Sequence, residues 1–286
     1  MDGFLLVNKS PGPSSFAVVK RVRTLCGGAR TGHAGTLDPA AAGLLIVGVG
    51  AATRLLEYLP AQPKKYTFTL RFGVETDTLD EEGPILKEGG RVPSLGEITS
   101  ALPRFIGATM QEPPRFSALK VRGRRSYDRA RNKEDFSLTP REISVQSLNI
   151  ISAGTPDSDV VFEVSCSTGT YVRALARDIA VSLGTIGHAR GIQRTEIGPF
   201  TLAEAVDFTA LTPPIELIPV KTMFKTCECI TIDVERQKQI TLGRDILLSH
   251  EGEAGKPFFA FNENDGLVAV LTQKEKRLFH PVKVFL

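Results

Sequence analysis

The sequence predicts an α+β protein in which a mixed β-sheet flanked by helices is followed by a small β-rich domain. Over the first 210 residues, strand-like and helix-like segments are interspersed without the regular alternation that builds a parallel sheet. Beyond about Cys229, only short strand-like segments remain. We therefore expect a first domain over residues 1–210, a linker over 211–228 and a β-rich domain over 229–286.

A strand over Phe4–Val7 opens the chain, and a capped helix follows it. Ser14 or Ser15 can cap this helix, and Gly27 and Gly28 end it. Its apolar residues recur at three-residue steps and predict a buried face made of Phe16, Val19, Val22 and Leu25.

A glycine-rich loop, Gly32–Pro39, leads into the apolar run Leu44–Val49. A second helix is expected over Thr53–Leu59, because Pro60 ends it. Residues 66–72 then alternate strictly between apolar and polar, which is typical of a half-buried strand. Its buried face would carry Tyr66, Phe68, Leu70 and Phe72.

The rest of the first domain is expected to contain a loop, Thr76–Gly90, a helix, Leu95–Leu102, and strands over Ile143–Ile151 and Val160–Cys166. After the turn Ser167–Thr170, a helix presents Val172, Leu175, Ile179 and Leu183 on one face and ends at Gly184. Pro213 and Pro214 mark the linker. The strands expected in the last domain are Cys229–Val234, Pro257–Phe261, Leu267–Leu271 and Val282–Phe285.

The composition is that of an ordinary folded protein: 42% of residues are apolar and 23% charged, with a formal net charge of +3. The longest weakly polar run, Pro39–Ala52, is shorter than the roughly 18–20 apolar residues that span a membrane. The first residues lack the basic and apolar regions of a secretory signal. Four scattered cysteines predict reduced thiols, so we expect a cytoplasmic protein.

Positive charge is concentrated in one segment. Residues 113–133 hold eight basic side chains and a single acid, Asp128. Such a run can be the footprint of an anionic polymer or simply a solvated basic face. The basic residues are Arg115, Lys120, Arg122, Arg124, Arg125, Arg129, Arg131 and Lys133.

Asp38 is the main candidate for chemistry. It lies in the glycine-rich loop, and Pro39 after it disfavours helical geometry. This carboxylate can project into a cleft as a nucleophile or base, or it can terminate a turn. Arg173, near the start of a helix and one turn before Arg177, can hold a carboxylate ionised or form a structural salt bridge. Tyr66 can equally be an ordinary core aromatic.

Nucleotide and metal cofactors are not indicated. Gly48 and Gly50 follow a strand, but the dinucleotide fingerprint needs a third glycine where the chain has Thr53. The four histidines and four cysteines do not form a metal-ligand pattern.

Residues 32–43, Gly-His-Ala-Gly-Thr-Leu-Asp-Pro-Ala-Ala-Ala-Gly, closely resemble a signature of the TruB family, the tRNA pseudouridine-55 synthases. That family reads G-H-T-G-T-L-D-P-x-A-x-G in its catalytic loop. Further matches follow in the family's order along nearly the whole chain. They are Asn8-Lys9, Lys65-Tyr66, residues 76–80, 114–131, 166–173 and 194–200. The end of the chain resembles the family's small PUA-type RNA-binding domain.

The resemblance implies a mixed-sheet pseudouridine synthase that isomerises uridine 55 in the T arm of tRNA. Enzymes of this family break the C1′–N1 bond, rotate the uracil and rejoin it through C5, using no cofactor or metal. The expected partner is the T stem-loop of tRNA, with no membrane or nucleotide cofactor involved, and we expect a monomer.

The resemblance also assigns roles to individual residues. Asp38 matches the essential aspartate, which either attacks the sugar or removes a ribose proton. Tyr66 matches the tyrosine that stacks on the uracil and is a candidate base for the C5 proton, and Arg173 matches the arginine paired with the aspartate. The remaining substrate-binding residues are Tyr171 and Ile192 in the uracil pocket, His33 at the flipped-out T loop, Lys9 as support of the loop, and Lys120 and Arg122 in the basic segment.

Three positions depart from the family pattern: Ser10 follows Lys9 where proline is usual, Ala34 replaces a threonine, and Gln193 replaces an arginine. None of them alters Asp38, Tyr66 or Arg173. Two other functions remain open: a non-catalytic RNA-binding protein on the same scaffold, and a riboside hydrolase that would release free uracil.

Overall fold

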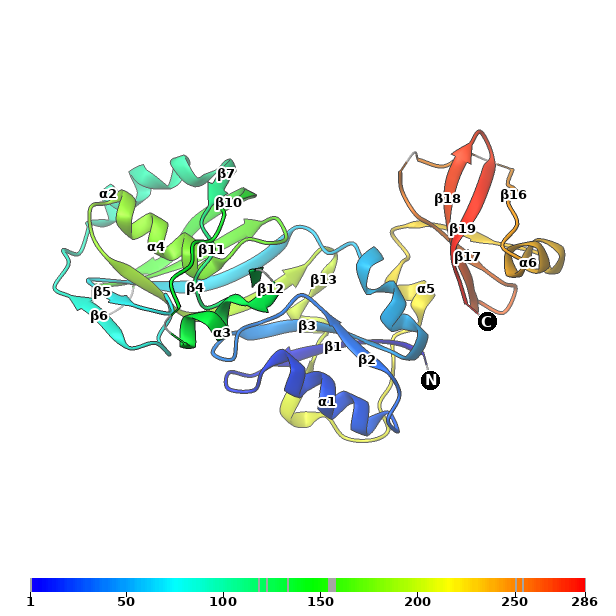
Figure 1. Cartoon of the computed structure of the whole chain (residues 1–286), viewed down its shortest axis with the longest axis horizontal. Helices are drawn as coiled ribbons and strands as arrows, with labels where there is room; N and C mark the ends of the chain where they lie inside the picture. Colours follow the sequence, from blue (N-terminus) through cyan, green and yellow to red (C-terminus); the bar gives the residue numbers. More distant parts are fainter. Residues whose placement is uncertain are drawn as a thin grey trace.

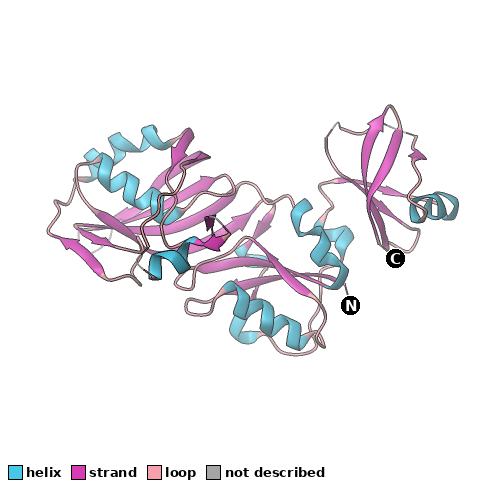
Figure 2. Cartoon of the chain, viewed as in Figure 1, coloured by secondary structure: helices cyan, strands magenta, loops and turns pink. Residues whose placement is uncertain are grey.

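The computed structural model describes residues 2–117, 119–121, 123–132, 134–153, 158–249, 251–253 and 255–285. Two sheets dominate these residues, and Figures 1 and 2 show the smaller one set to the side of the larger. No helix within the described ranges is long and apolar enough to cross a membrane.

The larger sheet is mixed, as predicted. Its strands are β1 (Gly3–Lys9), β2 (Thr31–Ala34), β3 (Ala42–Val49), β4 (Lys64–Phe72), β7 (Gly107–Gln111), β10 (Arg141–Ala153), β11 (Asp159–Cys166), β12 (Gly187–Ile197), β13 (Phe200–Thr201) and β14 (Val206–Asp207). They lie in the order β14-β1-β3-β12-β4-β11-β10-β7, with β2 paired to β3 and β13 to β12.

The centre of this sheet depends on one glycine. β12 runs antiparallel to β4 but parallel to β3, where Arg194 lies beside Gly43. A Cβ on Gly43 would lie 2.2 Å from the backbone oxygen of Arg194, and the φ of Gly43 is +105°. Only glycine fits this close approach without strain. Gly43 therefore lets β3 and β12 pair closely, next to the loop of residues 35–41.

The described helices pack on both sheets, with α6 on the smaller one. They are α1 (Ser15–Leu25), α2 (Leu95–Ala101), α3 (Ser126–Arg131), α4 (Val172–Ser182), α5 (Val220–Met223) and α6 (Val234–Thr241), with 3₁₀ helices η1 (Gly50–Tyr58), η2 (Leu102–Phe105), η3 (Leu202–Glu204) and η4 (Phe208–Ala210). α2 and α4 pack on β4, β10, β11 and β12, whereas α1 packs on β1 and β3. The helix expected over Thr53–Leu59 is the 3₁₀ helix η1, which begins three residues earlier than expected.

The predicted cap of α1 is confirmed, but its predicted buried face is partly wrong. The Ser14 side chain accepts a hydrogen bond from the Ala17 amide at 3.1 Å. Phe16, however, is 72% exposed, and Val18 is buried instead. A step of three residues turns an α-helix by about 300°, so a stripe built on such steps drifts round the helix. Phe16 and Leu25 consequently lie on different sides.

Two segments predicted as loops contain strands. Part of the glycine-rich loop forms β2, which pairs with β3 so that His33 lies opposite Val47. Residues 76–90 contribute to a hairpin of β5 (Val74–Thr76) and β6 (Ile85–Glu88). A second small hairpin joins β8 (Lys120–Val121) to β9 (Arg124–Arg125).

The smaller sheet has the order β15-β17-β18-β19-β16. Its strands are β15 (Glu228–Thr231), β16 (Ile246–Leu247), β17 (Phe258–Phe261), β18 (Leu267–Glu275) and β19 (Leu278–Val284). The predicted strand ending at Val234 is too long, because α6 begins there after an Asp233 cap. This helix was not predicted from the sequence.

The two sheets share an aromatic cluster. The Phe224 ring lies 6.0 Å from Phe4 of β1 and stacks on Phe259 of β17 at 4.2 Å. The predicted linker also pairs with the larger sheet, since the backbones of Phe4 and Ile218 exchange hydrogen bonds of 2.9 and 2.7 Å. The smaller sheet is therefore packed on the larger one through apolar contacts.

Candidate active site

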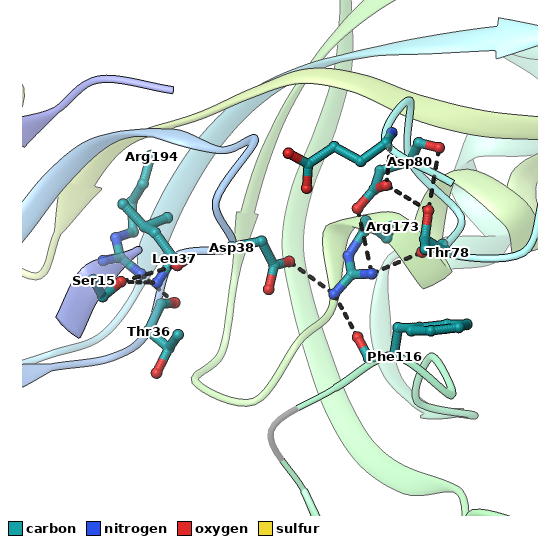
Figure 3. A network of polar contacts seen from close by, with 10 residues as sticks. Ser15, Thr36, Leu37, Asp38, Thr78, Asp80, Phe116, Arg173 and Arg194 are labelled. Carbon is teal, nitrogen blue, oxygen red and sulfur yellow. Dashed lines mark hydrogen bonds and ion pairs between the residues drawn. The ribbon is translucent and has the colours of Figure 1, made fainter. Parts of the chain in front are cut away.

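Asp38 and Arg173 are brought together by the fold. Asp38 lies between β2 and β3, and Arg173 is the second residue of α4. An Asp38 carboxylate oxygen lies 2.8 Å from Nη2 of Arg173 (Figure 3). The side chain of Arg173 is 5% exposed, whereas that of Asp38 is 41% exposed. The arginine is thus fixed within the protein, while the carboxylate remains accessible from outside.

Arg173 is itself held by three further groups. It donates to the backbone oxygens of Thr78 at 2.7 Å and Phe116 at 2.9 Å, and Asp80 lies 3.4 Å away. Asp80 is buried, and it accepts from the Thr78 hydroxyl at 2.5 Å. Asp80 had no predicted role, although it belongs to one of the matched motifs. A planar guanidinium with this many oxygen partners has little freedom to turn, so it fixes the orientation of Asp38.

The loop around Asp38 is clamped from both sides. The Ser15 hydroxyl donates to the Leu37 oxygen at 2.9 Å and accepts from the Leu37 amide at 2.8 Å. The ammonium of Lys9, which is fully buried, donates to the Pro39 oxygen at 3.0 Å and to two carbonyls of residues 10 and 13. Burial lowers the pKa of Lys9 to about 8, and its contacts are all with backbone oxygens.

Arg194 supports the same loop from β12. It is buried, and it donates to the Leu44 oxygen at 2.8 Å and to the Gly35 oxygen at 3.0 Å. Its guanidinium carbon lies 6.0 Å from the ring centre of Tyr66. Arg194 belongs to a matched motif but had no predicted role. The sequence does contain a sign of this role: Arg194 comes two residues after Ile192, so in a strand both side chains project from the same, inward face.

A cavity of about 320 Å³ opens beside Asp38. Burial raises the pKa of the Tyr66 hydroxyl, so the phenol is neutral near pH 7. Burial also raises the pKa of Tyr171, whose backbone is fixed by both amide atoms of the buried Gln111 at 2.8 and 3.1 Å. The cavity wall includes Asp38, Lys64, Tyr66, Tyr171, Ile192 and Arg194.

A second cavity, of about 650 Å³, lies beyond Arg173 and reaches the basic segment. His33 lines it, and its Nδ1 atom has no hydrogen-bond partner among the described residues. Burial, with the nearby Arg194, lowers the pKa of His33. Phe16, which the helical pattern placed in the core, also lines this cavity.

The basic segment is partly neutralised by its own neighbours. Arg124 and Arg129 form ion pairs with Glu134 at 2.9 and 2.8 Å, just beyond residues 113–133. By contrast, Arg125 and Arg131 flank the ring of Tyr127 at the rim of the second cavity. Arg122 lies outside the described residues, and for Lys120 only the backbone, in β8, is described.

Arg177 lies apart from this site. It donates to Asp178 and to the backbone oxygen of Glu112, and it makes no ion pair with Asp38. The site therefore combines one accessible carboxylate, its fixed arginine and a largely apolar cavity. A glycosidase usually uses a second carboxylic acid to protonate the leaving group. Asp80, which shares Arg173 with Asp38, is buried and engaged by Thr78 and Arg173, so it is not free to act as that acid.

Known proteins are similar to this chain in sequence. Residues 23–172 match the model of the TruB family pseudouridylate synthase (N terminal domain). The tRNA pseudouridine synthase B of Thermobifida fusca (strain YX) is 38% identical over 294 residues, covering 99% of this chain and 98% of that relative. The protein of the same name from Chelativorans sp. (strain BNC1) is 43% identical over 206 residues, covering 72% of this chain and 66% of the relative.

The fold also has solved counterparts. A chain in the crystal structure of a Cbf5-Nop10-Gar1 complex is similar with a TM-score of 0.75 and 24% identity, covering 99% of this chain and 85% of that one. This likeness confirms the expected fold class, a mixed sheet followed by a β-rich region.

Proposed function

This chain belongs to the TruB family of pseudouridylate synthases, and we propose that it converts uridine 55 in the T arm of tRNA to pseudouridine. The family resemblance of the sequence is thereby confirmed, as is the enzyme class, an isomerase that acts on tRNA. The position modified within tRNA and the roles of individual residues are part of the proposal.

The observation that carries the proposal is the exposed carboxylate of Asp38, fixed 2.8 Å from Arg173 at the wall of a 320 Å³ cavity. A uridine inside an RNA helix cannot reach such a carboxylate. It must leave its stack, which costs a few kcal/mol that contacts to the rest of the RNA offset. The cavity then receives the extruded nucleoside with its ribose next to Asp38.

Asp38 acts on the ribose. As nucleophile it attacks C1′, and as base it removes a ribose proton; both routes break the C1′–N1 bond and leave the electron pair on the uracil. Arg173 pairs with the carboxylate and orients it for either route. The uracil then turns and bonds to C1′ through C5. In the first route this bond displaces the Asp38 carboxylate from C1′, and in the second route Asp38 returns the proton to the ribose.

Tyr66 is proposed to stack on the uracil. Its ring lies on the buried face of β4, and it forms part of the cavity wall. Because burial raises the pKa of its hydroxyl, Tyr66 would first have to lose its own proton before it could remove the C5 proton. Burial therefore favours the stacking role over the role of base. Tyr171 and Ile192 would complete the apolar enclosure.

Several surfaces are proposed to bind the rest of the RNA. Arg125, Arg131 and His33 surround the second cavity, where the T loop would lie once its uridine is extruded. The smaller sheet, with its PUA-type resemblance, would contact the same tRNA as a separate domain beginning near residue 229. We propose that the protein acts as a monomer and, because its substrate is tRNA, in the cytoplasm.

The test is tritium release from an unmodified tRNA transcript that carries [5-³H]uridine. We expect one tritium released per tRNA, with the pseudouridine mapped to position 55. Release at another position would reject the T-arm specificity. Free uracil among the products would indicate a riboside hydrolase, and tRNA binding without any release would indicate a binding protein.

A further inference from the structure

Lys64 is a buried cation beside the reaction cavity that the roles proposed above do not use. It is the first residue of β4, is 7% exposed and lines the cavity next to Asp38. The cavity's other two cations are engaged: Arg173 by Asp38 and Asp80, Arg194 by backbone oxygens. Lys64 makes neither a hydrogen bond nor an ion pair with any side chain or backbone atom in the described part of the chain.

The surroundings of Lys64 disfavour its charge. Nζ lies 2.8 Å from the point where a Cβ would stand on Gly35, and Nη1 of Arg194 lies 3.6 Å from the same point. Two cations therefore face one glycine of the Asp38 loop. Burial, with the charge of Arg194, lowers the pKa of Lys64 to about 8. A buried charge without a partner costs several kcal/mol, so a lysine retained here indicates a partner that arrives with the substrate.

The position of Lys64 on its strand indicates which part of the substrate it meets. Alternate residues of a strand project from the same face, about 7 Å apart, and Lys64 and Tyr66 are both buried on that face of β4. If the uracil stacks on the Tyr66 ring, the Lys64 ammonium lies toward the edge of the base. The edge of a uracil carries its carbonyl oxygens.

We propose that Lys64 binds a carbonyl oxygen of the target uracil and stabilises the negative charge of the detached base, an inference that rests on the proposed function. When the C1′–N1 bond breaks, its electron pair stays on the uracil and is shared by N1 and the carbonyl oxygens. When C5 bonds to C1′, that pair forms the new bond and the ring becomes neutral. C5 then loses its proton and N1 gains one.

This charge exists only between bond cleavage and bond formation. A fixed cation that meets it there lowers the barrier without tightening the binding of the intact substrate. A tRNA phosphate is the alternative partner. Its charge is present in the ground state, so binding it would tighten the complex instead, and the burial of Lys64 inside the cavity favours the base.

Three variants of the full chain test the proposal: Lys64→Met, Lys64→Ala and the matched control Lys65→Met. Lys65 is the next residue, points to the opposite face of β4 and pairs with Glu196. For Lys64→Met we expect the single-turnover rate of tritium release to fall by about 10²-fold, as for loss of one preorganised charge-stabilising donor. The tRNA Kd should stay within threefold of wild type, and Lys65→Met should change neither quantity.

Two further measurements separate catalysis from structure. Because Lys64→Met removes an unpaired buried charge, its Tm should equal or exceed that of the wild type. In Lys64→Ala, added propylammonium should restore part of the rate, since it can refill the space with a cation.

A rate within threefold of wild type for Lys64→Met would overturn the proposal. So would a Kd that rises as much as the rate falls, which would assign Lys64 to a phosphate, or a Tm that drops sharply, which would make it structural. All rates are compared with wild-type tritium release from the same tRNA, so failure of the proposed function itself would be seen in the wild type first.

Discussion

The loop that carries Asp38 and the basic segment of residues 113–133 are held in opposite ways. Around Asp38, the fixing contacts come from distant parts of the chain: Ser15 lies 22 positions from Leu37, and Arg194 lies 159 positions from Gly35. In the basic segment, the arginine side chains make local contacts: Arg115, Arg124 and Arg129 reach Glu134 and Phe136. The backbone oxygen of Phe116, by contrast, accepts a hydrogen bond from the distant Arg173.

This difference matches two physical requirements. Chemistry at one atom of the ribose needs the carboxylate in one place, and a misplacement of about 1 Å can cost 10²-fold in rate. Long-range contacts meet this need, because they exist only in the completed fold. Phosphate contacts act mainly through charge and tolerate adjustment, so a segment held by its own neighbours can serve them.

The largest expected effect is at the carboxylate itself. Asp38→Asn keeps the shape of the side chain but removes the charge, so turnover should fall by at least about 10³-fold. Because phosphate contacts come from elsewhere, the tRNA Kd should stay within tenfold. Single-turnover tritium release and filter binding measure the two quantities. An affinity loss as large as the rate loss would show that the two regions are not separable.

Removing Arg173 should affect both rate and stability. Arg173→Met leaves the buried Asp80 without its cation and frees Asp38 to turn. We expect about 3 kcal/mol less free energy of unfolding, and a rate about 10²-fold lower. Arg173→Lys keeps the charge and should lose less stability. Urea unfolding followed by circular dichroism measures the free energy of unfolding, which should fall from wild type to Arg173→Lys to Arg173→Met. Equal stability of the methionine variant and wild type would contradict this prediction.

The clamp on the loop offers a milder test. Ser15→Ala leaves both the amide and the oxygen of Leu37 without their partner, which should cost about 1–3 kcal/mol. The rate should fall about tenfold as Asp38 loses its fixed position. Ser14→Ala is the matched control, because Ser14 caps the same helix without contacting Leu37. Equal rates in the two variants would mean that the clamp does not position Asp38.

The smallest effect should come from the basic segment. Arg125→Gln and Arg131→Gln together should weaken tRNA binding several-fold and leave the single-turnover rate unchanged at saturating enzyme. The slope of log Kd against log salt should fall by about one for each phosphate that an arginine no longer neutralises. Arg104→Gln, at an exposed position of η2, serves as control. An unchanged salt slope would remove these arginines from the RNA interface.

Features with a local cause could be predicted from the sequence. The strict alternation of residues 66–72 lies in β4 with the predicted face buried, and the Ser14 cap lies where the pattern put it. β2 was missed because its strand character comes from pairing with β3, on residues that read locally as a glycine-rich loop. For the site, the family motifs led to Asp38, Tyr66 and Arg173, which line one cavity.

The burial of the cations could not be predicted in this way, although the resemblance had given Lys9 a role in supporting the loop. Lysine and arginine are almost never fully buried without partners, so a sequence places them on the surface by default. Lys9 and Arg194 are exceptions because the fold brings backbone oxygens of residues 35–44 to them. Those oxygens are present at every position of every chain, and only the completed structure shows which ones are free to accept.

The pairing of Phe4 with Ile218 also bears on how the chain folds while it is being made. β1 is buried on both faces, and its edge is completed by Ile218 and β14, more than 190 residues later. At about 5–20 residues per second, synthesis of the intervening segment takes roughly 10–40 s. During that time the first strand, with Phe4 and Leu6, has no covering partner from the smaller sheet. We therefore expect the edge of β1 in nascent chains to stay open to chaperones or neighbouring chains until the second half has emerged.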